Sequence, residues 1–231
     1  MEQGLGFSHF ISQTDSIGRI VLLLLLLLSL ASWYLIVTKA LGNWLARRRA
    51  NRFLAAFWQL DSLESMSAMV SRNGGDNAFA ELAAQALAAA RNGNGHGLQK
   101  LAAAGGMAEF LTRALRNGIE QEAARSEHGL TVLASAGSAA PYVGLFGTVW
   151  AIYHALVQIG LSGQGTLDKV AGPVGEALIM TALGLAVAIP AVLAFNAFNR
   201  RNRLWLARLD GFAHDLYVML SVGTADGEGA A

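Results

Sequence analysis

The fold of this chain is decided by residues 170–199, which read VAGPVGEALIMTALGLAVAIPAVLAFNAFN. A helix rises about 1.5 Å per residue, so a helix of this length is more than long enough to cross a bilayer. Glu176 is the only ionisable side chain in the stretch. A charge near a bilayer centre costs about 2.5–3.5 kcal/mol on insertion scales, and such residues usually face a bundle interior or carry protons. The function of the chain is therefore expected to depend on Glu176.

Two further charge-free stretches predict two more spans. Residues 20–37 read IVLLLLLLLSLASWYLIV, and residues 129–167 contain no Asp, Glu, Lys or Arg. The alternative for the first stretch is a cleaved signal peptide, but the acids Glu2 and Asp15 precede it and little positive charge does. Over the whole chain, 54% of residues are hydrophobic and 14% are charged, whereas about a quarter are charged in soluble domains. We expect an all-α integral membrane protein with three transmembrane helices.

The basic residues near the span ends predict the orientation. Five follow the first span and four follow the third: Lys39, Arg47, Arg48, Arg49, Arg52, Arg200, Arg201, Arg203 and Arg208. Only Arg19 precedes the first span, and only Lys169 lies between the second and the third. We therefore expect a periplasmic N-terminal segment (1–19), transmembrane helix 1 (20–38), a cytoplasmic helical region (39–128), transmembrane helix 2 (129–159), a periplasmic loop (160–169), transmembrane helix 3 (170–199) and a cytoplasmic C-terminal helix and tail (200–231).

The middle region is predicted to face water. Residues 40–128 hold ten basic and eight acidic side chains. Residues 78–90 and 107–128 have helical patterns, with Asp76 or Asn77 as the cap of the first. Because we identify no helix breaker after residue 107, the second helix is expected to continue into transmembrane helix 2. The region contains no catalytic constellation, and the chain has no Cys, which excludes thiol catalysis, cysteine-ligated metals and disulfides.

Small residues and prolines in the second and third spans predict how these helices pack. Gly144, Gly147 and Gly184 are expected to allow close helix packing, since packing rather than the hydrophobic effect holds helices together in lipid. Pro141 and Pro190 are expected to kink their helices and to free a carbonyl in each.

Polar side chains accompany Glu176 in these spans. Thr148 and Thr181 carry hydroxyls, which either bond back to their own helices or line a polar lumen together with the carboxylate. Thr181 lies five residues after Glu176, about 140° around an ideal helix, so the two cannot share one narrow stripe. His154 is a second titratable group, either a proton relay or an interface residue.

The sequence around these residues resembles the ExbB/TolQ/MotA proton-channel family. The resemblance rests on PYVGLFGTVW at 141–150, EAL at 176–178, TALGL at 181–185 and AIPAV at 188–192. Length and three spans are closer to the ExbB and TolQ branches than to MotA. Two departures are Ala151, where the family commonly has Gly, and Val174–Gly175 before the Glu, where it often has Gly-Ile-Ala.

The resemblance implies a homopentamer in the bacterial inner membrane whose second and third spans line a pore. An ExbD-like or TolR-like single-span dimer would lie in that pore, and force would reach a TonB-like or TolA-like protein. Glu176, Thr148 and Thr181 would form the proton pathway. We expect a motor subunit that uses the proton-motive force for TonB-dependent import, with ExbB favoured over TolQ.

Several other roles remain as alternatives or are expected to be absent. A passive membrane assembly scaffold is the rival from another class, and a secondary transporter is disfavoured because no internal repeat is visible. We expect membrane lipids as partners, no nucleic acid, no metal, no cofactor and no enzymatic activity.

Overall fold

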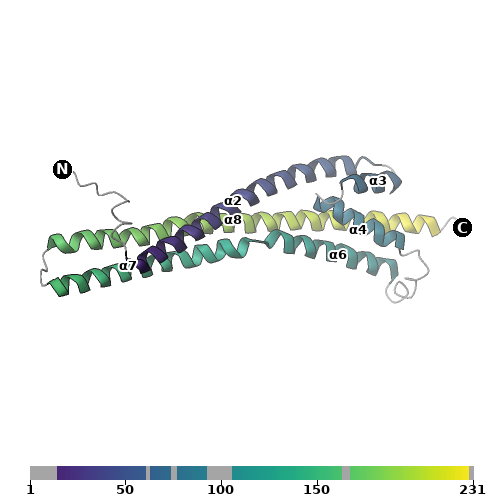
Figure 1. Cartoon of the computed structure of the whole chain (residues 1–231). Coiled ribbons are helices and arrows are strands. Elements are labelled where there is room, and N and C mark those ends of the chain that lie inside the picture. The colour runs from purple at the N-terminus through teal and green to yellow at the C-terminus, as the bar shows by residue number, and fades with distance from the viewer. Residues whose placement is uncertain (1–14, 61–62, 74–76, 93–105, 163–166, 229–231) are drawn as a thin grey trace. The chain divides into compact units, whose positions relative to one another are not determined.

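The computed structural model describes residues 15–60, 63–73, 77–92, 106–162 and 167–228 (Figure 1). Within these ranges the secondary structure is helical, with short turns. The helices are α2 (Ser16–Phe57), α3 (Leu63–Asn73), α4 (Ala78–Asn92), α6 (Gly106–Glu127), α7 (Leu130–Ser162) and α8 (Leu167–Glu228). This arrangement confirms the all-α prediction.

Three stretches of helix are long and apolar enough to cross a membrane. They lie within Ser16–Phe57, Ala108–Leu161 and Ala177–Ser221, and the second range includes the two turn residues between α6 and α7. Many of their large apolar side chains are exposed, among them Leu23, Tyr142 and Leu193. Such apolar surfaces are stable in contact with lipid. A helix forms all of its backbone hydrogen bonds internally, as the bilayer interior requires. The prediction of three long apolar helices is therefore confirmed.

The chain divides into two compact units. The first, called the membrane unit, comprises Met1–Thr38 and Gly129–Phe198, and the second, called the polar unit, comprises Lys39–His128 and Asn199–Ala231. Helices α2 and α8 each contribute to both units. The divisions lie within one residue of the span ends expected at 38, 129 and 199. The segment bounds expected from the sequence, and the sides of the membrane assigned to the segments, stay predictions.

The membrane unit is held together by small and medium apolar side chains from α2, α7 and α8. Two buried clusters contain Val21, Leu25, Ala140, Met180, Val187 and Ala188 in one, and Leu130, Leu133, Ala136, Ala191 and Phe198 in the other. Alanines alternate with longer side chains at these contacts, so the helices can lie close together.

The polar unit has a core like that of a water-soluble helical domain. Four aromatic side chains from α2, α4 and α8 pack in its centre, with the ring of Phe212 5.3 Å from that of Phe57 and 5.4 Å from that of Phe79. Trp205 lies 5.2 Å from Phe79 in an edge-on arrangement. Aromatic pairs in this geometry contribute beyond their buried area.

The helix starts follow local capping chemistry. The Gly18 amide donates to Asp15 Oδ1 (2.8 Å), so Asp15 caps α2. The Phe79 amide donates to Asn77 Oδ1 (3.1 Å), so Asn77 caps α4. The predicted start of that helix and one of its two candidate caps are confirmed. Asp76, the other candidate, lies outside the described residues.

The chain turns between α6 and α7, at His128 and Gly129. Gly129 has a φ of 78°, a conformation that lacks a steric cost only for glycine. The prediction that one unbroken helix continues from residue 107 into transmembrane helix 2 was therefore wrong. The cause is a helix-terminating glycine at the first residue of the expected span.

Two predicted segments lie partly outside the description. In the loop expected at 160–169, α7 continues to Ser162 and α8 begins at Leu167, while 163–166 are not described. Of the N-terminal segment expected at 1–19, the structure describes residues 15–19.

Candidate functional site in the membrane unit

Helices α7 and α8 approach each other backbone to backbone at Gly144 and Gly184, and Figure 1 shows their green segments side by side. A methyl group on Gly144 would lie 2.6 Å from the Met180 carbonyl oxygen and 3.0 Å from the Gly184 Cα. A methyl group on Gly184 would lie 2.6 Å from the Ala140 carbonyl oxygen. Neither position can accept a side chain unless the backbones separate.

Helix α2 joins this contact through Val21. A methyl group on Gly147 would lie 2.5 Å from Met180 Sδ and 2.9 Å from Val21 Cγ1. All three membrane-unit helices therefore meet at one level, where two glycines of α7 leave room for the side chain and the backbone of Met180.

Two hydroxyls meet at the same level. Thr148 Oγ1 lies 2.5 Å from Thr181 Oγ1, 3.0 Å from the Ala177 carbonyl oxygen and 3.2 Å from the Gly144 carbonyl oxygen. We call Thr148, Thr181 and the Ala177 carbonyl the threonine bridge. Thr148 is buried, whereas Thr181 is only partly buried.

The number of hydroxyl protons in the threonine bridge constrains which group donates each hydrogen bond and which accepts it. A hydroxyl has one proton and two acceptor lone pairs. If the Thr148 hydroxyl donates its proton to a carbonyl, its oxygen must accept a hydrogen bond from the Thr181 hydroxyl. The Thr181 hydroxyl then has no further proton to donate. The Thr181 oxygen keeps acceptor capacity for another donor, such as a water or a protonated carboxyl group. Thr148 therefore contacts a carbonyl of its own helix and a carbonyl of α8, and a polar lumen shared with Glu176 stays a prediction.

Glu176 belongs to α8 and immediately precedes Ala177, whose carbonyl is part of the threonine bridge. Its side chain lies outside the part of the chain that the structure describes. The sequence places the third span's one acid next to the polar contact, and the ideal-helix offset of about 140° from Thr181 still applies to α8.

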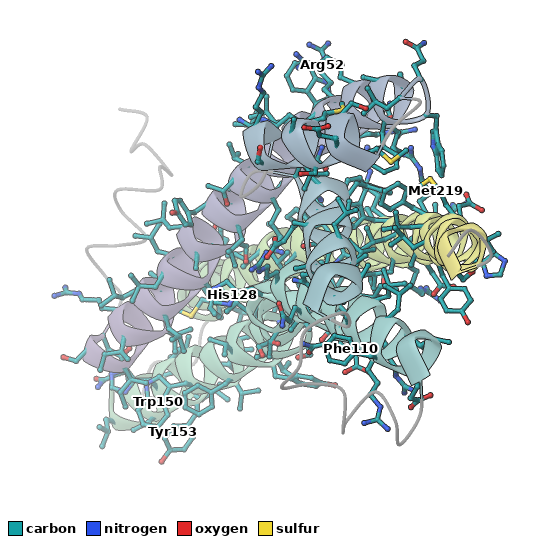
Figure 2. The ribbon with its side chains drawn as sticks, turned by 90° about the vertical axis from the view of Figure 1, so that its right-hand side faces the viewer. Arg52, Phe110, His128, Trp150, Tyr153 and Met219 are labelled. Carbon is teal, nitrogen blue, oxygen red and sulfur yellow. The ribbon has the colours of Figure 1, made fainter. Side chains whose placement is uncertain are left out.

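A second polar contact ties the start of α2 to α7. Trp150 Nε1 donates to Asp15 Oδ2 at 2.6 Å. The Trp150 ring lies 6.1 Å from that of Tyr153, and Figure 2 shows the two side chains next to each other on α7. Sequence reasoning missed this contact, because 135 residues separate the partners. The available signal was Asp15 itself, an acid at the capping position before an apolar helix.

The electrostatics of Asp15 follow from its neighbours. Partial burial raises the pKa of its carboxyl group, but hydrogen bonds from Trp150 and from the Gly18 amide and the nearby charge of His154 outweigh burial. The net pKa lies below the ordinary value of 3.8. His154 is exposed and near this carboxylate, so both roles proposed for it, relay and interface, stay predictions.

The remaining predicted positions lie within helices. Pro141 is inside α7 and Pro190 inside α8, and both helices continue past them. The kinks expected there stay predictions. In the part of the chain that the structure describes, no group of three His, Cys, Asp or Glu side chains could hold a metal ion.

Comparisons with known proteins find one family profile and relatives that align over most of the chain. The profile of the MotA/TolQ/ExbB proton channel family matches residues 78–210. The biopolymer transport protein ExbB of Xanthomonas campestris is 39% identical over 232 residues, covering 95% of this chain and 90% of the relative. ExbB of Neisseria meningitidis is 43% identical over 200 residues, covering 87% and 90%. The Tol-Pal system protein TolQ of Pseudomonas aeruginosa is 33% identical over 220 residues, covering 94% of each chain.

The family profile covers more than half of the 231 residues, and relatives align over nearly the full length. The same chain forms three long apolar helices, with a polar bridge where α7 and α8 pack. This multi-pass membrane protein belongs to the MotA/TolQ/ExbB proton channel family.

Proposed function

We propose that the chain is a proton-driven motor subunit of the bacterial inner membrane that energises TonB-dependent import across the outer membrane. The observation that carries the proposal is the threonine bridge, a polar contact buried between two apolar helices and adjacent in sequence to Glu176. Polar groups within a span face a bundle interior or a water path, and this bridge lies one residue from the only ionisable side chain of the third span.

The proposed mechanism begins with the protonation of Glu176. An ionised carboxylate is costly in an apolar span, and taking a proton from the periplasmic side removes that cost. The protonated group is a hydrogen-bond donor, and the Thr181 oxygen retains acceptor capacity within the bridge. Because Glu176 and Thr181 lie about 140° apart on α8, a water would link the two groups. Release of the proton toward the cytoplasm would reverse this state. The bridge would thereby couple the protonation state of Glu176 to the packing of α7 against α8.

The energy available per proton sets the number of sites required. A charge that crosses the membrane gains about 2.3 kcal/mol per 100 mV of potential. One such step is small compared with the work of moving a large assembly, so several sites must act in turn. A homopentamer with α7 and α8 around its pore would supply five Glu176 residues.

The expected partners follow from the same family membership. An ExbD-like single-span dimer would lie in the pore and move as the Glu176 sites change protonation state, and a TonB-like protein would receive the force. The ExbB relatives are named biopolymer transport proteins, which supports a transport role for this chain.

The test of the mechanism is Glu176→Gln, which keeps shape and polarity and removes titration. We expect loss of siderophore-dependent growth with normal membrane levels and normal oligomer size. The matched control is Glu109→Gln, an equal change in charge at an exposed ion pair with Arg113 in α6. Growth of the Glu176→Gln strain at the wild-type rate would refute the proposal.

The TolQ branch is the second candidate, supported by 33% identity to TolQ of Pseudomonas aeruginosa over 94% of the chain. Identities of 39% and 43% to two ExbB relatives favour ExbB. Expression in strains lacking either their ExbB or their TolQ separates the branches. We expect restored siderophore-dependent growth in the first strain and continued detergent sensitivity in the second.

A passive scaffold would bind the same partners without moving protons. Liposomes containing the chain and its single-span partner distinguish the two roles. The motor proposal predicts proton flux that Glu176→Gln abolishes, whereas a scaffold predicts no flux above that of empty liposomes.

A further inference from the structure

The polar unit contains a cavity of about 580 Å³, within the range of about 300–1,000 Å³ typical of sites for small ligands. Residues from α2, α6 and α8 line it, and all of them belong to the polar unit. Five of these side chains are basic and one is acidic: Lys39, Arg47, Arg125, Arg201, Arg208 and Glu122. The cavity therefore concentrates positive charge in a chain whose net charge is only +1.

Two of the charges already have partners. Arg125 forms a bidentate ion pair with Glu81, at 2.6 and 3.1 Å. Glu122 Oε1 accepts a hydrogen bond from Trp205 Nε1 at 2.9 Å. These contacts hold the cavity wall in place and leave Glu122 as the single carboxylate that faces the remaining cations.

The other four cations have no carboxylate partner among the described residues. Lys39 Nζ donates to the neutral Ser126 carbonyl at 2.9 Å, and Arg208 donates to the neutral side-chain amide of Asn51 at 3.0 Å. No ion pair is found for Arg47 or Arg201 in the described ranges. Like charges gathered around one cavity repel each other, and an anion bound between them would remove that cost.

The position of these residues in the chain indicates where the anion comes from. Lys39 directly follows the membrane unit on α2, Ser126 precedes it by three residues, and Arg201 follows it by three residues on α8. The membrane placement expected from the sequence would put these residues at the ends of the three spans, near the lipid headgroups.

Apolar side chains next to the cavity favour a lipid over a free anion. Leu41, Trp44 and Leu45 lie on one face of α2, at helical spacing, and each is about half exposed. Trp44 lines the cavity and stacks on Arg48, with the guanidinium carbon 3.7 Å from the ring centroid. A Trp beside basic residues is typical of the membrane–water interface, where its ring lies at the level of the lipid headgroups.

We propose that this cavity binds the phosphate of an anionic phospholipid, with Lys39, Arg47 and Arg201 as its cationic contacts. The acyl chains of that lipid lie along the apolar face of α2. The lipid bridges α2 and α8 just beyond their spans and fixes the ends of the two helices relative to each other. This inference requires the membrane placement but not proton transfer.

The experiment uses the full-length protein in detergent, titrated with phosphatidylglycerol or phosphatidylcholine and observed by native mass spectrometry. We expect preferential retention of phosphatidylglycerol. The variant Lys39→Gln/Arg201→Gln should weaken it roughly thirtyfold, because it removes two cations and each cation near a lipid surface contributes about 1 kcal/mol. The matched control, Arg113→Gln/Arg116→Gln, removes two exposed α6 charges and should bind as the wild type does.

Two further variants and a competition with inorganic phosphate distinguish the proposed lipid site from its alternatives. Arg47→Gln alone changes an exposed side chain, cannot disturb a core, and should weaken phosphatidylglycerol binding by a smaller factor. Glu176→Gln should leave lipid retention unchanged, which separates this inference from the motor proposal. Equal retention of both lipids, full retention by the double variant, or displacement of the lipid by millimolar inorganic phosphate would each overturn the inference.

Discussion

The two threonine hydroxyls contribute to the membrane unit through one shared contact. Thr148 is buried and bonded to carbonyls of two helices, and Thr181 completes its hydrogen bonding. Polar contacts between membrane helices average about 0.6 kcal/mol and reach about 1.7 kcal/mol. A buried, short contact with a carbonyl acceptor belongs in the upper part of that range.

Thr148→Val and Thr181→Val are each expected to destabilise the protein by about 1 kcal/mol. The double variant should lose less stability than the sum of the two single losses, because both substitutions remove the same hydrogen bond. Unfolding in mixed micelles measures this coupling. Thr38→Val is the matched control, since its hydroxyl donates only to carbonyls of its own helix, Tyr34 at 2.8 Å and Leu35 at 3.3 Å. Strictly additive losses would mean that the two hydroxyls do not act together.

Asp15 predicts a pH dependence at the start of α2. Its carboxyl pKa is lowered in the folded protein, so its stabilisation is fully present above the unfolded pKa, near 3.8, and is lost as the pH falls through the folded value. Asp15→Asn should lower the melting temperature at pH 7, and this deficit should disappear at a pH well below 3.8. Melting temperatures of both proteins across this pH range check the prediction. A deficit that persists unchanged in acid would mean that the charge of Asp15 is irrelevant.

Helices α7 and α8 depend on glycine for their closest approach. Gly144→Ala and Gly184→Ala each place a methyl group 2.6 Å from a backbone carbonyl oxygen of the facing helix, and backbone cannot rotate away. Overpacking of this kind costs about 1–3 kcal/mol. Both variants should also weaken the threonine bridge, because the helices must separate.

Gly211→Ala on the same α8 is the control for these variants. A methyl group there meets no atom within 4 Å, and alanine favours a helix over glycine by about 1 kcal/mol. Denaturation should show loss of stability for Gly144→Ala and Gly184→Ala and no loss for Gly211→Ala. Unchanged stability in all three would contradict the close approach of α7 and α8.

Sequence patterns predicted the helices well because each signal is local. Apolar runs of span length and the Asn77 cap are read within a few residues, and both are present in the structure. The turn at Gly129 was missed because the local sequence does not distinguish a glycine that ends a helix from a glycine at a contact between helices. Only the φ of 78° does so.

Contacts between helices could not be predicted in the same way. Thr148 and Thr181 are 33 residues apart, and their contact depends on the register of α7 against α8. That register is set by which glycines face each other, and the sequence offers several. The basic cavity likewise depends on three helices, whereas in the sequence Arg47 and its neighbours are only a basic run after a span.

For the whole molecule, the distribution of basic residues predicts which ends face the cytoplasm. Nine of the seventeen Lys and Arg residues directly follow the first or the third span, and the segments assigned to the outside carry two. Basic segments are retained on the cytoplasmic side during insertion. An impermeant reagent should therefore reach the outer ends of α2 and α7 from the periplasm and the exposed residues of the polar unit from the cytoplasm.

The chain has no Cys, so a single introduced cysteine is a unique label. Ser16→Cys and Gly160→Cys, at exposed positions near the outer ends of α2 and α7, should react with an impermeant maleimide in cells with a permeabilised outer membrane. Thr112→Cys and His214→Cys, exposed in the polar unit, should react only after the inner membrane is opened. Labelling after lysis controls for reactivity. The opposite pattern would place the basic cavity at the outer leaflet and reverse the proton path proposed for Glu176, so both proposals depend on this outcome.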